Sequence, residues 1–198
     1  RQIAPGCRCE VYPNALPLIP QPTRLEQKVL IFSGNLDYHP NVTAVRFFRT
    51  RIWPALAARW PDLRWRLVGR NPEGVRKHVG GDARIELTGP VEDALSELAT
   101  AKVVVVPLLT GSGTRVKIIE AWAAGRAVVS TSLGAEGLPA RGGEHLLLAD
   151  TPESFALAVS LLLESAEERR RLGQAGRALY EQQLTWPAAW ERLKKAGI

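Results

Sequence analysis

The sequence is poor in the residues that build membrane spans, disulfide frameworks and metal sites. Its 198 residues include two cysteines, three histidines and no methionine. No run approaches the roughly 20 apolar residues of a membrane-spanning helix, and the first residues do not form the apolar stretch of a secretory signal. Cys7 and Cys9 are two ligands where a zinc site needs about three or four, so we interpret both as incidental and expect no metal.

The low cysteine content and the absent initial methionine bear on the cellular compartment and on the domain organisation. A low cysteine content suits the reducing cytoplasm, and we expect a cytoplasmic protein, with peripheral contact at the inner membrane face as an open alternative. The chain does not begin with methionine, and residues 1–27 contain five prolines. We interpret this stretch as a linker from a preceding domain, with one short strand at residues 9–12.

What is present is typical of a folded domain. Hydrophobic residues make up 45% of the chain and charged residues 23%, which allows a sizeable core and excludes general disorder. The net charge of +6 is compatible with nucleic acid, an anionic membrane or a phosphorylated small molecule. It comes mostly from scattered arginines, and no helix-turn-helix, RNP or zinc signature is visible. We therefore expect no nucleic-acid partner.

Six short apolar runs alternate with helical patterns. Runs that are apolar nearly throughout are typical of strands covered on both faces, and they occur at residues 29–32, 67–68, 85–88, 103–106, 127–129 and 146–148. Helical spacing occurs at residues 41–60, 91–100, 115–124, 167–182 and 187–195, and in a segment that starts at Thr151. This alternation predicts an α/β fold, a doubly wound, Rossmann-like parallel sheet of about six strands with extra C-terminal helices.

Four residues mark expected helix ends. Asn41 and Thr151 are candidate N-caps, Pro152 suits the first helical position, and Gly125 suits the end of the helix over residues 115–124.

Glycine follows five of the six predicted strands at or soon after the carboxyl end. Ligands of parallel α/β sheets bind at that edge. Each glycine alone is explained by a tight turn, but their shared edge favours a ligand-binding rim. The five are Gly34, Gly69, Gly89, Gly111 and Gly134.

Residues 110–120 are the most informative segment. Gly111 and Gly113 free the backbone to surround an anion, Thr114 is a candidate cap of the helix that follows, and Arg115 and Lys117 add positive charge. The segment lacks the G-x-x-x-x-G-K-[ST] pattern of a P-loop. The dinucleotide fingerprint is also absent after the first strand, which disfavours an NAD(P) enzyme.

Glu120 is the second element of this segment. It lies six residues beyond Thr114, about 9 Å along a helix, and its carboxylate would accept hydrogen bonds from adjacent ribose hydroxyls. The alternative is a surface ion pair with Lys117, three residues earlier. Its apolar neighbours favour the functional role.

Residues 111–131 closely resemble a signature of retaining glycosyltransferases of the GT-B fold, those of family 4 and its relatives. Residues 32–35, 67–69, 88–93 and 150–155 match further segments in the expected order, so the resemblance covers residues 28 to about 190. It implies that Glu120 binds the ribose of a nucleotide diphosphate sugar. It also implies donor contacts from Gly34, Asn35, Gly89, Pro90, Val91, Gly111, Ser112, Gly113 and Thr114.

Two positions depart from the family pattern. Ser112 stands where many relatives carry a glutamate that contacts the donor sugar, so we expect sugar recognition to differ. Asn35 and Pro40 stand in the region where many relatives carry an arginine and a lysine for the diphosphate. Our hypothesis is that Arg115 and Lys117 replace them as the catalytic cations that stabilise the leaving diphosphate.

The resemblance also implies a domain organisation. Residues 28–183 would form the donor-binding domain, and residues 184–198 a helix that crosses back to an absent N-terminal acceptor domain. The expected partners are a nucleotide-sugar donor, that acceptor domain and a glycan or lipid-linked acceptor, with no cofactor beyond the co-substrate. We expect this part alone to be inactive, and a non-catalytic nucleotide-sugar-binding module is the alternative function. His39, in the loop after the first strand, is a further candidate for ligand contact.

Overall fold

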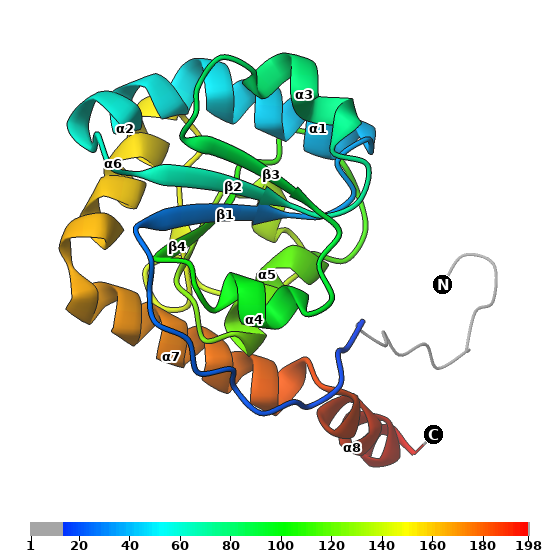
Figure 1. Cartoon of the computed structure of the whole chain (residues 1–198). Helices are drawn as coiled ribbons and strands as arrows, with labels where there is room; N and C mark the ends of the chain where they lie inside the picture. Colours follow the sequence, from blue (N-terminus) through cyan, green and yellow to red (C-terminus); the bar gives the residue numbers. More distant parts are fainter. Residues whose placement is uncertain (1–13, 198) are drawn as a thin grey trace.

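A parallel sheet of six strands forms the centre of the computed structural model, which describes residues 14–197 (Figure 1). The spatial order is β3-β2-β1-β4-β5-β6. This confirms the predicted fold class and all six predicted strands, while the strand expected at residues 9–12 lies outside the described residues. The strands are β1 (Val29–Ser33), β2 (Arg64–Val68), β3 (Ile85–Gly89), β4 (Val103–Val106), β5 (Val128–Ser130) and β6 (Leu147–Leu148).

The strand order fixes where a ligand can bind. The chain runs outward from β1 to β3 and then crosses over to β4 on the other side of β1. Every residue of β1 and β4 is buried, as expected for central strands covered on both faces. The topological switch point therefore lies between Ser33 and Val106, the last residues of these two strands.

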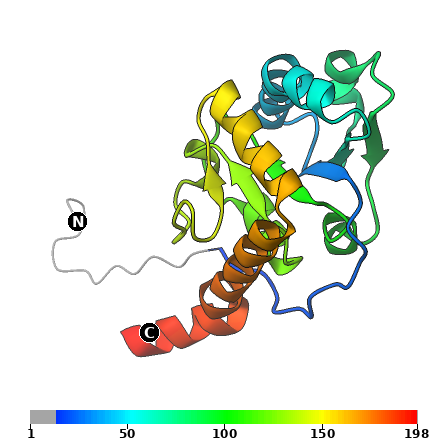
Figure 2. The ribbon, with the colours of Figure 1, turned by 90° about the vertical axis from the view of Figure 1, so that its left-hand side faces the viewer.

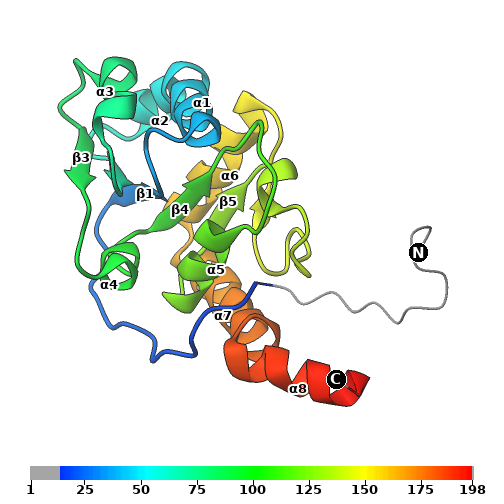
Figure 3. The same ribbon diagram turned by 90° about the vertical axis from the view of Figure 1, so that its right-hand side faces the viewer.

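Helices cover both faces of the sheet. α1, α2, α3 and α6 lie on one face, and α4, α5 and α7 lie on the other (Figures 1 and 3). α8 contacts α7 and extends away from the sheet (Figure 2). The helices are α1 (His39–Phe47), α2 (Trp53–Arg59), α3 (Glu73–Val79), α4 (Ala94–Leu98), α5 (Val116–Ala123), α6 (Pro152–Glu164), α7 (Ala166–Gln183) and α8 (Trp186–Ala196), with short helical turns η1 (Phe48–Ile52) and η2 (Leu133–Ala135).

The helix predicted over residues 41–60 begins earlier and is interrupted. A π-helical turn, η1, separates α1 from α2. Pro54 lies in the first turn of α2, and its missing N–H cannot continue an α-helical ladder. The prediction that Asn41 caps this helix is wrong. Asn41 is buried inside the first turn, and its Nδ2 donates to the Asn35 carbonyl at 2.6 Å.

The other helix ends vary in how well they were predicted. Thr151 caps α6 in a reciprocal capping box with Ser154, as the sequence predicted for the cap. Gly125 has a φ of 68° just after α5, which confirms its terminating role. The helix predicted over residues 91–100 is shorter and spans only Ala94–Leu98. It begins after Asp93, whose side chain caps it by accepting hydrogen bonds from the Leu95 and Ser96 N–H groups. α3 was not predicted.

Residues 14–27, which we call the strap, pack along α7 and do not form a separate linker. The Arg177 guanidinium donates to the Ile19 carbonyl at 2.6 Å. Glu26 accepts from Arg169 at 2.8 Å and from Arg126 at 3.1 Å. Leu16 forms a parallel bridge with Thr185. The strap is therefore part of the folded domain.

Candidate functional site

The carboxyl ends of β1, β2 and β3 pack backbone against backbone. Gly34 N donates to Val68 O at 2.9 Å, and Gly69 N donates to Gly89 O at 3.0 Å. Gly69 has a φ of 142°, and a Cβ there would stand 1.9 Å from the Gly34 carbonyl oxygen. The glycine at position 69 is thus required by this close packing, whatever the ligand.

The loop between β4 and α5 carries the two predicted anion-binding glycines. Gly111 and Gly113 have φ values of 116° and 91°, conformations that favour glycine. The prediction that Thr114 caps α5 is wrong. Arg115 occupies the N-cap position without a side-chain cap bond, and Thr114 contributes only its carbonyl, which accepts from Val116 N at 2.9 Å.

A cavity of about 130 Å³ lies at the start of α5, beside the switch point. It brings the loop after β4 together with the first turn of α1. Its lining includes five predicted site residues: Gly111, Ser112, Thr114, Arg115 and Lys117, together with Tyr38, Pro40, Asn41, Val106, Leu108, Thr110, Val116, Ile118 and Gly134.

Lys117 reaches from α5 to the loop after β1. A Cβ on Gly34 would lie 2.2 Å from the Lys117 Nζ, so the absent side chain of Gly34 makes room for the ammonium group. The Nζ also lies 5.1 Å from the centre of the Phe32 ring. Burial lowers the pKa of Lys117 to about 8, and the nearby Glu120 carboxylate partly opposes that shift.

Glu120 lies one turn further along α5 and is half-buried. Burial raises the pKa of its carboxyl, and Lys117 opposes the shift. Within residues 14–197 no hydrogen bond or ion pair engages this carboxylate, so the alternative of a surface ion pair with Lys117 is not observed. Glu120 lines neither this cavity nor the larger one described below.

Arg115 is almost wholly buried, with 4% of its side chain exposed. Its Nη2 donates to the Gly111 carbonyl at 3.3 Å and to Glu136 Oε2 at 3.2 Å. Its Nε is buried with no hydrogen-bond partner. The guanidinium therefore ties the glycine loop to the segment after β5 and adds positive charge to the wall of the cavity.

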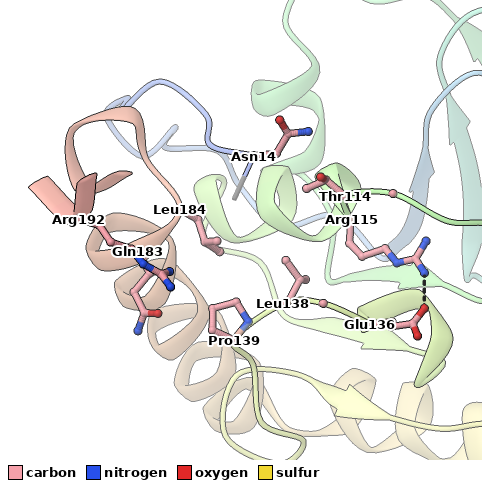
Figure 4. Close-up of a pocket in the computed structure, with 11 residues that line it drawn as sticks. Asn14, Thr114, Arg115, Glu136, Leu138, Pro139, Gln183, Leu184 and Arg192 are labelled. Carbon is pink, nitrogen blue, oxygen red and sulfur yellow. Dashed lines mark hydrogen bonds and ion pairs between the residues drawn. The ribbon is translucent and has the colours of Figure 1, made fainter. Parts of the chain in front are cut away.

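A second, larger cavity of about 550 Å³ lies on the other side of Arg115 (Figure 4). Glu136 lines it and was not predicted, although Gly134, two residues earlier, was noted at the same edge. Its partner Arg115 is 21 residues away in sequence, so no local pattern joins them. The lining is Asn14, Gly113, Thr114, Arg115, Glu136, Gly137, Leu138, Pro139, Gln183, Leu184 and Arg192.

The remaining predicted residues lie around these cavities without lining them. The Asn35 side chain accepts from Asn71 at 3.0 Å. His39 is exposed at the start of α1. Gly89 ends β3, and Pro90 and Val91 lie in the connection to α4, a helix that contacts α5 on the same face of the sheet (Figure 1).

Neither a metal-ion cluster nor a membrane-spanning helix occurs in the described residues. Residues 14–197 contain no cluster of three His, Cys, Asp or Glu side chains placed to hold a metal ion. None of their helices is both long and apolar enough to cross a membrane.

The fold is that of one Rossmann-like half of a GT-B glycosyltransferase. Sucrose-phosphate synthase from Thermosynechococcus elongatus matches 94% of this chain over 51% of its own, with a TM-score of 0.75 and 20% identity. Anabaena Alr3699/HepE, solved in complex with UDP and glucose, matches 86% of this chain over 48% of its own, with a TM-score of 0.71 and 16% identity.

The chain belongs to the family of glycosyl transferases group 1, whose model matches residues 27–165. A phosphatidyl-myo-inositol mannosyltransferase of Mycobacterium tuberculosis strain H37Rv is 32% identical over 161 residues, which are 76% of this chain and 42% of the relative. An uncharacterized 44.6 kDa protein from the cps region of Klebsiella pneumoniae is 26% identical over 135 residues, 64% of this chain and 35% of the relative. The chain thus spans less than half the length of these relatives.

Proposed function

We propose that this glycosyltransferase chain is the donor-binding half of an enzyme that moves a hexose from a nucleotide diphosphate sugar to an acceptor with retention of configuration. The observation that carries the proposal is the pair of Lys117 and Glu120 on α5. Both are charged groups that burial disfavours, and neither forms an ion pair within residues 14–197. Groups held at such a cost at a switch point are candidates for ligand binding.

The diphosphate fits the start of α5. The positive end of the α5 dipole favours an anion at this position, and Lys117 supplies a cation whose burial leaves its field weakly screened. Arg115 adds charge from the wall of the same cavity. As the sugar leaves the diphosphate, negative charge builds on the phosphate oxygens, and these groups stabilise it. We propose no metal or cofactor.

The nucleoside fits further along α5. A ribose beside Glu120 would donate from its two hydroxyls to the unengaged carboxylate. The base would then lie toward the connection from Gly89 to Val91, because α4 packs beside α5. Gly34 and Asn35 would face the donor from the end of β1.

Transfer also needs an acceptor-binding half, which we place outside these residues. This chain would bind donor and be inactive by itself. Relatives named phosphatidyl-myo-inositol mannosyltransferases favour a lipid-linked acceptor over a free glycan, with peripheral contact at the cytoplasmic membrane face.

Thermal shift and calorimetry against UDP-, GDP-, ADP- and dTDP-sugars test the proposal, with NAD and DNA as controls. We expect one sugar nucleotide to stabilise the wild type. Glu120→Ala should weaken it by at least tenfold, the loss of about 1.4 kcal/mol. Glu167→Ala, at an exposed position on α7, serves as the matched control and should bind normally.

Stabilisation by NAD or DNA and by no sugar nucleotide would overturn the proposal. Adding a separately produced acceptor half distinguishes the enzyme from a non-catalytic binding module. Donor binding without transfer in the complete protein would favour the module.

A further inference from the structure

Glu136 lies in the wall of the larger cavity, and its carboxylate pairs with the buried guanidinium of Arg115. The side chain of Glu136 is 68% exposed, whereas that of its partner Arg115 is 4% exposed. Arg115 contacts only Oε2, at 3.2 Å. Within residues 14–197 the other oxygen, Oε1, has no hydrogen-bond partner. The Glu136 carboxylate is thus held through one oxygen, and its other oxygen is open to accept hydrogen bonds from a ligand.

The two cavities are neighbours that share part of their lining. Thr114 and Arg115 line both, so a ligand bound at the start of α5 that extends past them enters the larger cavity. The smaller cavity holds about 130 Å³ and the larger about 550 Å³. The smaller one suits an anionic group near Lys117, and the larger one has room for a bulkier neutral group attached to it.

The chemistry of the larger cavity suits a polyhydroxylated ring. Figure 4 shows Glu136 at one end and the side chains of Gln183 and Arg192 at the other, with Leu138 and Pro139 between them. Sugar hydroxyls both donate and accept. Carboxylate oxygens can only accept, a guanidinium can only donate, and an amide does both. The apolar side chains can pack against the C–H face of a ring.

We infer that Glu136 reads the hydroxyls of the donor sugar, held in position by Arg115, and that the larger cavity is the sugar subsite. The inference rests on the proposed function, because it takes the diphosphate to bind beside Lys117. Glu136 is then a specificity-determining residue, and Arg115 is a positioning residue that acts through it as well as through its charge.

The test compares each nucleotide sugar with its own nucleotide, so that the contribution of the sugar is measured separately. Calorimetry gives Kd for UDP-glucose and UDP and for GDP-mannose and GDP with the wild type. The variants are Glu136→Gln, Glu136→Asp and Glu144→Gln. The last is the control, because Glu144 is an exposed carboxylate that pairs with Arg141 at 3.5 Å.

We expect Glu136→Gln to leave the Kd of the bound nucleotide within twofold and to weaken its sugar conjugate by about tenfold, which corresponds to roughly 1.4 kcal/mol. Glu136→Asp keeps the charge beside Arg115 but withdraws the carboxylate by one methylene. It should weaken the sugar conjugate selectively as well. Glu144→Gln should change neither.

Three results would overturn the inference, and they differ from each other. Equal weakening of nucleotide and sugar nucleotide by both Glu136 variants would make Glu136 a support for the loop through Arg115. Unchanged binding of both ligands would remove it from the site. A wild type that binds neither nucleotides nor their sugars would defeat the proposed function itself.

Discussion

At the scale of single residues, Lys117 is the group whose environment most opposes its charge. Burial lowers its pKa to about 8, well below the usual value for lysine. Within residues 14–197 no salt bridge within 4 Å compensates for that burial. A bound diphosphate would supply the missing negative charge, so we expect ligand binding and protonation of this amine to be coupled.

The first prediction concerns the pH dependence of donor binding. An anion raises the pKa of Lys117 in the complex, so affinity is full below pH 8 and falls as pH rises through 8. With a pKa of about 8, the protonated fraction drops about tenfold between pH 7 and pH 9, and Kd should rise by about the same factor. Calorimetry at both pH values measures it. Lys117→Arg stays charged throughout, and an equal loss of affinity in that variant would contradict the assignment.

The second prediction is that removing the charge of Lys117 raises the thermal stability of the free protein and abolishes donor binding. Lys117→Met removes an ammonium group that burial disfavours and keeps most of the packing volume. We expect the Tm of the free protein to rise by about 2–4 °C, the shift that roughly 1 kcal/mol produces in a chain of this size. Donor binding should be lost. Differential scanning calorimetry measures the shift, with Lys77→Met, at an exposed lysine on α3, as control. A lower Tm for Lys117→Met would show that the amine stabilises the free protein.

At the scale of elements, the loops after β1 and β2 lie so close that no side chain fits between them. Gly69→Ala would place a methyl group 1.9 Å from the Gly34 carbonyl, at a φ of 142°. We expect a loss of about 2–4 kcal/mol in the free energy of unfolding. Gly81→Ala is the matched control, with a φ of 87° and nothing within 4 Å of the new Cβ. It should cost about 1 kcal/mol. Urea unfolding separates the two, and equal losses would mean that strain alone, without the clash, explains Gly69.

The sequence predicted the strands better than the helices. Buried central strands are apolar throughout, and that pattern is local. The interruption between α1 and α2 depends on Pro54, whose effect a helical-spacing pattern does not register. α3 has only seven residues, and just Val75 and Val79 are buried, so its periodicity is too weak to detect.

The sequence predicted the segment that lines the smaller cavity but not the contacts that this segment makes. Residues 111–120 carry a recognisable pattern. The position of Lys117 beside Gly34, however, requires β1 and β4 to be neighbours, and the chain between them is long. The bond between Arg115 and Glu136 likewise joins two different loops. Spacing within one helix could not reveal either contact.

At the scale of the whole molecule, ion pairs hold the strap against α7 and against the segment between α5 and β5. Glu26 accepts from Arg169 and Arg126, whose side chains are 7% and 13% exposed. Burial lowers the pKa of Arg126, and the Glu26 carboxylate opposes that shift. One carboxylate therefore compensates two largely buried cations.

The fourth prediction follows from this arrangement. Glu26→Gln should lower the free energy of unfolding by about 1–3 kcal/mol, because both guanidinium groups lose their buried counter-charge. Urea titration at pH 7 measures it. Glu73→Gln removes an exposed partner of Arg76 on α3 and should leave the midpoint unchanged. An unchanged midpoint in Glu26→Gln would mean that the strap contributes little to stability.

The bridge between Leu16 and Thr185 has a mechanical consequence. The two segments run parallel, and two hydrogen bonds join them, from Leu16 N to Leu184 O at 2.9 Å and from Trp186 N to Leu16 O at 3.0 Å. The chain before Leu16 and the chain after Thr185 leave the bridge in opposite directions. Tension applied between them therefore loads both bonds at once, in shear instead of opening them one after the other. The bridge is therefore placed to resist a pull between these two segments before the load reaches the sheet.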